Sequence, residues 1–153
     1  MRNSSHAHLY FHRGITRLEI CIVVIIVSLL GLYIGEKVSQ KIGSARQQQV
    51  ATDLQRIAAG LHQYKLDNKR YPTEAQGLRA LLEVPTADPL ASRWNGPYLS
   101  RDSLLIDPWG RDYIYRASDA PPTFTLQTLG GDGKEGGEGG KSDTILKYQS
   151  SGI

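Results

Sequence analysis

The chain has 153 residues, 40% of them hydrophobic, which suffices for one small domain with a buried core and an additional segment. Its net charge of +3 is a small difference between 18 basic and 15 acidic residues, so nothing indicates a nucleic-acid partner. A single cysteine, Cys21, excludes an intramolecular disulfide.

The N-terminal part has the layout of a signal or anchor. Residues 1–13 contain arginines and histidines but no acid, and an uncharged apolar run follows at residues 20–35. A cleaved secretory signal is one interpretation, but no Ala-x-Ala type site closes the run. We expect the segment to remain attached as one membrane helix, and the basic flank favours a cytoplasmic N-terminus.

One carboxylate, Glu19, stands at the head of this apolar run. Moving a charge into hydrocarbon costs roughly 2.5 to 3.5 kcal/mol, so such a charge usually has a partner. Glu19 therefore suggests contact with another chain inside a membrane. The alternative is an interfacial acid at the end of a simple anchor.

The next segment has the pattern of an amphipathic helix. Its apolar residues recur at spacings of four and three: Val50, Leu54, Ile57, Leu61 and Tyr64. Because no proline occurs between Ile15 and Leu66, we expect one helix of about 50 residues. Turn residues and Pro72 end it.

The remainder predicts an α+β domain. Thr73 and Gln76 form a capping-box pattern ahead of a short helix. Residues 104–106, 113–116 and 123–128 are predicted strands of a small antiparallel sheet. Residues 144–153 are compatible with a strand or with disorder.

A glycine-rich loop at residues 129–143 contains several carboxylates. Calcium prefers six to eight oxygen ligands, which the carboxylates of Asp132, Glu135, Glu138 and Asp143 and the carbonyl of Leu129 could help to supply. The loop does not match an EF-hand, since Lys134 follows Asp132-Gly133. On composition alone, a solvated flexible loop is the better interpretation.

No enzymatic site can be assembled from the sequence. Three of the four histidines lie within the first 13 residues, and His62 stands alone on the long helix. Gly140-Lys141-Ser142 imitates the end of a phosphate-binding loop, but no strand and helix flank it appropriately. We expect a protein that is not an enzyme.

Five motifs nevertheless carry a resemblance. They are Gly-Ile-Thr-Arg-Leu-Glu at 14–19, Tyr-Lys-Leu-Asp-Asn at 64–68, Tyr-Pro-Thr-Glu-Ala-Gln-Gly-Leu at 71–78, Asp-Pro-Trp-Gly at 107–110, and the glycine-rich stretch at 129–139. In this order they resemble the major pseudopilins of type II secretion systems, within the type IV pilin-like family. The first motif is common to that whole family, whereas the later ones are specific to the major pseudopilins.

The resemblance implies a pilin-like fold and an order of segments. Residues 1–14 would be a leader, residues 15–35 a transmembrane and filament-core helix, and residues 36–153 a periplasmic globular domain. A prepilin peptidase would cut after Gly14 and methylate Ile15, where the family usually has phenylalanine. Glu19 would then lie near the terminal amine of a neighbouring subunit and set the register between subunits.

The implied function is structural. The chain would polymerise into a periplasmic pseudopilus that drives folded proteins across the outer membrane. Its implied partners are further copies of itself, minor pseudopilins, the prepilin peptidase, an inner-membrane assembly platform and secreted protein substrates. The family also binds calcium in the loop, which implies Leu129, Asp132, Asp143 and, less directly, Glu138 as ligands.

Two other functions fit parts of the sequence. A monomeric membrane-anchored calcium-binding module would need neither Glu19 nor the glycine before Ile15. A pilin of a true type IV pilus commonly closes its C-terminal region with a disulfide, for which this chain lacks a cysteine pair.

Overall fold

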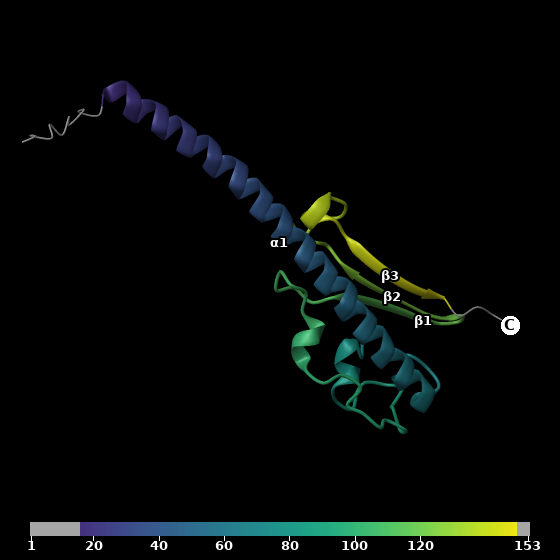
Figure 1. The fold of residues 1–153 in the computed structure, drawn as a ribbon. Coiled ribbons are helices and arrows are strands. Elements are labelled where there is room, and N and C mark those ends of the chain that lie inside the picture. The colour runs from purple at the N-terminus through teal and green to yellow at the C-terminus, as the bar shows by residue number, and fades with distance from the viewer. Residues whose placement is uncertain (1–15, 150–153) are drawn as a thin grey trace, which may run out of the picture. The chain divides into compact units, whose positions relative to one another are not determined.

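The computed structural model describes residues 16–149 (Figure 1). Helix α1 (Arg17–Asn68) comes first, followed by the 3₁₀ turns η1 (Leu78–Leu81) and η2 (Asp102–Leu105). Strands β1 (Ile114–Asp119) and β2 (Pro122–Thr128) follow, and η3 (Gly139–Lys141) precedes β3 (Thr144–Gln149). The expected α+β class with one long N-terminal helix is confirmed.

The chain divides into two units, residues 1–38 and residues 39–153. In the first unit, the described part of α1 exposes its apolar side chains, and its most apolar window has a mean hydropathy of 2.6. By length and composition this helix can cross a membrane. Within it, the Ser28 hydroxyl donates to the Val24 carbonyl over 2.8 Å, so that polar group is satisfied inside the helix.

In the second unit, α1 supplies one wall of the core. Each residue of the predicted stripe at positions 50, 54, 57, 61 and 64 exposes 1% or less of its surface. Asp53, expected on the polar side, is also buried and lies 3.7 Å from the Arg56 guanidinium. Burial, with the nearby charge of Asp53, raises the pKa of the Tyr113 hydroxyl.

The sheet supplies the other wall. Its order is β1-β2-β3, and both pairs are antiparallel, with Leu126 of the central strand opposite Tyr115 and Leu146. Alternate residues of β2, namely Phe124, Leu126 and Thr128, are buried. Residues 144–149 form β3 and continue the sheet, whereas the rest of the tail, residues 150–153, lies outside the described residues.

Two predicted elements differ from the structure. Residues 104–106 are not a strand; Leu104 belongs to η2, and Ile106 makes a single bridge to Asp112. The Asp107 amide donates a hydrogen bond to the Arg111 carbonyl over 2.7 Å and closes a tight turn, so the pairing of these two segments ends at the single bridge.

The capping box forms, with Gln76 and Thr73 bonded reciprocally at 3.0 and 3.2 Å. Gly77, at a φ of 60°, then interrupts the helix, and only a 3₁₀ turn follows.

Gln76 has a second role beyond the capping box. Its side-chain amide donates to the carbonyls of Ala87 and Pro89 at 2.7 and 2.9 Å, and its residue is 7% exposed. Gln76 therefore helps to hold the proline-rich loop at residues 85–97, together with Arg70, which donates to the Pro89 carbonyl, and Trp94, whose ring nitrogen donates to the Ala80 carbonyl of η1.

We expect Gln76→Ala to destabilise the domain by about 2–3 kcal/mol, since the hydrogen bonds to the Ala87 and Pro89 carbonyls and from the Thr73 amide would all be lost. Thermal unfolding of the detergent-solubilised full chain, followed by circular dichroism, should show a fall of about 4–10 °C. Gln63→Ala makes the same change at an exposed helix position and should have little effect. Equal unfolding temperatures for the two variants would contradict this role for Gln76.

Candidate functional site

The glycine-rich loop at residues 129–143 connects β2 to β3 and contains η3. Gly130 has a φ of 61°, and a Cβ there would lie 2.4 Å from the Lys141 carbonyl oxygen. Gly140 packs against Gly43 of α1, where a Cβ would come within 2.9 Å of the Gly43 Cα. The glycines thus allow the loop to fold back on itself and onto the helix.

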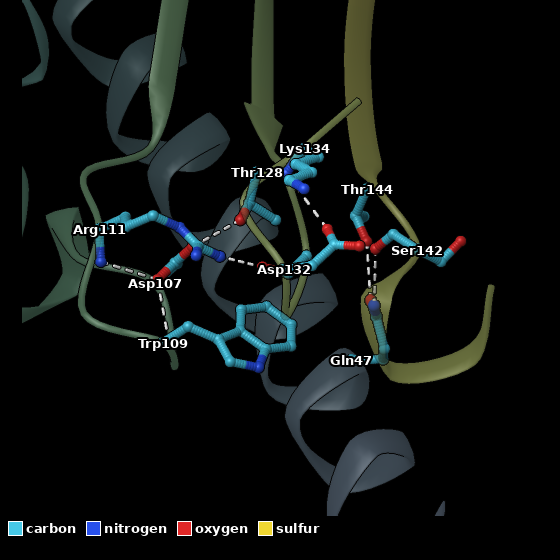
Figure 2. Close-up of polar contacts among 10 residues, drawn as sticks. Gln47, Asp107, Trp109, Arg111, Thr128, Asp132, Lys134, Ser142 and Thr144 are labelled. Atoms are coloured by element: carbon cyan, nitrogen blue, oxygen red, sulfur yellow. Dashed lines mark hydrogen bonds and ion pairs between the residues drawn. The ribbon is translucent and has the colours of Figure 1, made fainter. Parts of the chain in front are cut away.

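The buried carboxylate of Asp107 organises the turn beside this loop (Figure 2). Its Oδ1 accepts hydrogen bonds from the amides of Trp109 and Arg111, at 3.0 and 2.9 Å. Its Oδ2 accepts from the Thr128 hydroxyl at 2.6 Å and lies 3.5 Å from the Arg111 guanidinium. Both oxygens of the buried Asp107 carboxylate are therefore satisfied by nearby donors.

Arg111 links that turn to the loop. Its guanidinium donates to the Gly130 carbonyl while it pairs with Asp107 (Figure 2). The Asp-Pro-Trp-Gly turn, the end of β2 and the start of the loop are therefore held by one hydrogen-bond network.

Gln47 holds the other end of the loop to α1. Its side-chain nitrogen donates to the Ser142 carbonyl at 2.8 Å, and its oxygen accepts from the Thr144 hydroxyl at 2.8 Å (Figure 2). Both groups of one amide are therefore used at the point where the loop joins β3.

The expected calcium ligands are not gathered into one cluster. Asp132 is exposed and accepts from the Lys134 amide at 3.1 Å, and Glu138 is exposed at the start of η3. Within residues 16–149, no three His, Cys, Asp or Glu side chains converge closely enough to hold a metal.

Asp143 is the position that fits a cation. Its Oδ2 accepts from the Gly136 amide at 3.1 Å, whereas its Oδ1 is buried and has no hydrogen-bond partner. A buried carboxylate oxygen without a donor is costly, and the surrounding glycine-rich backbone provides carbonyl oxygens, the ligands that calcium prefers. Leu129, whose carbonyl is the expected backbone ligand, is half-buried at the start of the loop.

The second predicted site lies at the beginning of α1. The Glu19 amide donates to the Thr16 hydroxyl oxygen at 3.2 Å, so Thr16 caps the helix. The Glu19 side chain is exposed in the first turn, where the helix dipole favours a negative charge. Gly14 and Ile15, the expected processing positions, lie outside the described residues.

Sequence reasoning missed most of the network around the loop. Asp107 enters the sequence analysis only within the Asp-Pro-Trp-Gly motif, although an Asp side chain commonly accepts a hydrogen bond from the backbone amide two residues later and so forms a turn. The spacing between Gln47 and Ser142 gave no signal, because the two residues meet only through the fold.

Comparison with known proteins identifies the family of the globular part. The family described as type II secretion system (T2SS), protein G, matches residues 37–147. A type II secretion system core protein G from Pseudomonas aeruginosa is 40% identical over 131 residues, which cover 85% of this chain and 91% of the relative. The corresponding protein from Vibrio cholerae is 40% identical over 130 residues, covering 85% of this chain and 88% of the relative.

A solved structure agrees with these relatives. The crystal structure of the major pseudopilin from the type 2 secretion system of enterohaemorrhagic Escherichia coli is 36% identical, with a TM-score of 0.54. It matches 67% of this chain and 86% of that chain. The chain therefore belongs to the type II secretion system protein G family, the major pseudopilins, which are structural subunits and not enzymes.

Proposed function

We propose that this chain polymerises through its N-terminal helix into the periplasmic pseudopilus of a type II secretion system and thereby drives the export of folded proteins across the outer membrane. The observation that carries this proposal is the exposed apolar helix of a chain in this family. Side chains such as Ile22, Leu29 and Leu32 expose 49%, 62% and 74% of their surface. Apolar surface of this extent needs lipid before assembly and neighbouring helices after it.

Glu19 supports assembly with a defined register. Its carboxylate is exposed on the isolated subunit, and the described residues offer it no ion-pair partner. In a bundle of apolar helices, a charge of this kind is stabilised by the amine at the start of a neighbouring mature chain. A slip of one helix along another would separate the two charges.

The proposed location follows from this chemistry. The chain would be a single-pass protein of the bacterial inner membrane with residues 36–153 in the periplasm. A prepilin peptidase would release residues 1–14, and an inner-membrane assembly platform and minor pseudopilins would start and extend the polymer.

We also propose that calcium stabilises the subunit by binding in the glycine-rich loop. Asp143 is the central ligand, with Asp132, Glu138 and the Leu129 carbonyl as the further candidates. A bound divalent cation would neutralise the carboxylates and fix the loop. Asp107, Arg111 and Gln47 hold the two ends of the loop in place.

Processing gives the first test. When the full chain is co-expressed with a prepilin peptidase, mass spectrometry should find a mature protein that begins with N-methylated Ile15. Gly14→Val should leave the leader attached, because the larger residue blocks cleavage. An intact Met1 in the unaltered chain, or a cut beyond Tyr33, would instead favour a simple anchor or an exported domain.

Glu19→Gln keeps the side-chain shape but removes the charge, and it should reduce filaments sheared from the cells by at least about tenfold. Cleavage should continue in this variant, which mass spectrometry can confirm. Glu36→Gln removes the next acid along the helix and serves as the control. Normal filament yield from Glu19→Gln would refute the proposed charge pairing.

Calcium should raise the unfolding temperature of the detergent-solubilised full chain. At a calcium concentration 100 times Kd the stabilisation is about 2.7 kcal/mol, or about 5–10 °C. Asp143→Asn should abolish the rise, and Glu135→Gln, at an exposed position of the same loop, should keep it. An unchanged melting curve in calcium and in chelator would rule out this site.

A further inference from the structure

Two hollows of opposite charge lie at the two edges of the sheet. The first, called here the basic hollow, has a volume of about 370 Å³ and includes Tyr148 of the edge strand β3. It is lined by His62, Lys65, Leu66, Lys69, Tyr71 and Tyr148. The lining contains two lysines and no acid, so the hollow would attract a negatively charged group.

The second, called here the acidic hollow, has a volume of about 450 Å³ and includes Tyr115 of β1, the opposite edge strand. Its charged lining residues are Glu74, Arg79, Asp102 and Asp112. The lining therefore contains three carboxylates and one guanidinium. That guanidinium, of Arg79, forms an ion pair with Glu83 over 3.8 Å.

The cations of the basic hollow have no acidic partner among residues 16–149 of the subunit. The Lys65 ammonium lies 4.8 Å from the centre of the Tyr71 ring, and the Lys69 ammonium donates to the Leu66 carbonyl at 2.9 Å. Among the residues that the structure describes, no carboxylate lies within 4.0 Å of either ammonium. Burial, and then the charge of Lys65, lowers the pKa of His62, so the two lysines supply the positive charge near neutral pH.

The carboxylates of the acidic hollow are similarly available. Glu74, Asp102 and Asp112 are exposed, and within the described range none of the three forms an ion pair. Each hollow also has an exposed apolar residue that contact would bury. Leu66 is 64% exposed beside the basic hollow, and Ile106 is 46% exposed in the acidic one.

From this geometry we infer that the basic hollow of one subunit binds the acidic hollow of a second copy of this chain. A contact between two different surfaces leaves one free surface of each kind, so it repeats, and it produces an open helical polymer when the repeated rotation does not close into a ring. Complementary charge fixes which edges meet, and the apolar residues supply contact area. This inference rests on the proposed filament and assigns a lateral contact within it.

Charge reversal tests the contact. Lys65→Glu combined with Lys69→Glu should lower the yield of sheared filaments about tenfold or more, because like charges would face each other. Adding Glu74→Lys and Asp102→Lys to the same chain should restore the yield. Arg93→Glu combined with Lys147→Glu reverses two exposed cations outside both hollows and outside the glycine-rich loop, and is the control. Failure of the fourfold variant to recover, although it unfolds at the temperature of the unaltered chain, would overturn the inference.

Cysteine cross-linking tests the same contact without reversing its charges. In a Cys21→Ser chain that still forms filaments, Lys65→Cys together with Asp102→Cys should give a ladder of multimers after oxidation. Each single cysteine should give no ladder, since one cysteine can join only two chains. Lys65→Cys with Ser118→Cys, on the exposed side of β1, is the matched control pair.

The outcomes separate this contact from the proposed function. Filaments without a ladder from the Lys65 and Asp102 pair would overturn the lateral contact and leave the pseudopilus proposal standing. Absence of filaments from the unaltered chain would overturn both. Cross-links from Lys65→Cys to a secreted acidic protein, with no ladder, would assign the basic hollow to a different partner and would also reject the inference.

Discussion

The structure depends on one helix that must satisfy two environments. Beyond residue 50, α1 buries a continuous apolar stripe against its own sheet, and the core of the globular unit forms around that stripe. In the described part of the chain before residue 39, the apolar side chains of the same helix are not covered and remain exposed. The subunit is therefore chemically incomplete, and lipid or other copies must supply what its own chain does not.

Inside the globular unit, several polar side chains with more than one partner gather around the glycine-rich loop. Asp107, Arg111 and Gln47 each use several hydrogen bonds to tie the loop to a turn, a strand and the helix. Within the loop, Asp143 keeps a buried carboxylate oxygen for which the described residues provide no donor. A loop that is anchored at both ends and contains one unsatisfied carboxylate oxygen is consistent with the proposed stabilising cation.

Sequence patterns predicted what depends on local chemistry. The helical stripe from Val50 to Tyr64 was evident from spacing because a helix repeats every 3.6 residues. The segment at residues 104–106 was predicted wrongly because its propensity favours a strand, whereas the Asp107 turn leaves no length for pairing. The bonds of Gln47 join residues almost a hundred positions apart, so no local pattern could reveal them. The expectation that the glycine-rich loop binds calcium came from the resemblance, since its composition alone favours a solvated flexible loop.

Apolar helices alone do not specify a filament. Their attraction is proportional to buried area and has little directional preference, so many registers and rotations would have similar free energies. Sparse charges remove that degeneracy, because a misplaced carboxylate or ammonium in or near a desolvated interface costs more than several methyl groups contribute. In the proposed assembly Glu19 fixes the axial register, and the basic and acidic hollows at opposite sheet edges fix which faces meet. Glu19 and the two hollows lie in different parts of the chain. A substitution at one therefore leaves the other intact, and their contributions to assembly can be measured separately.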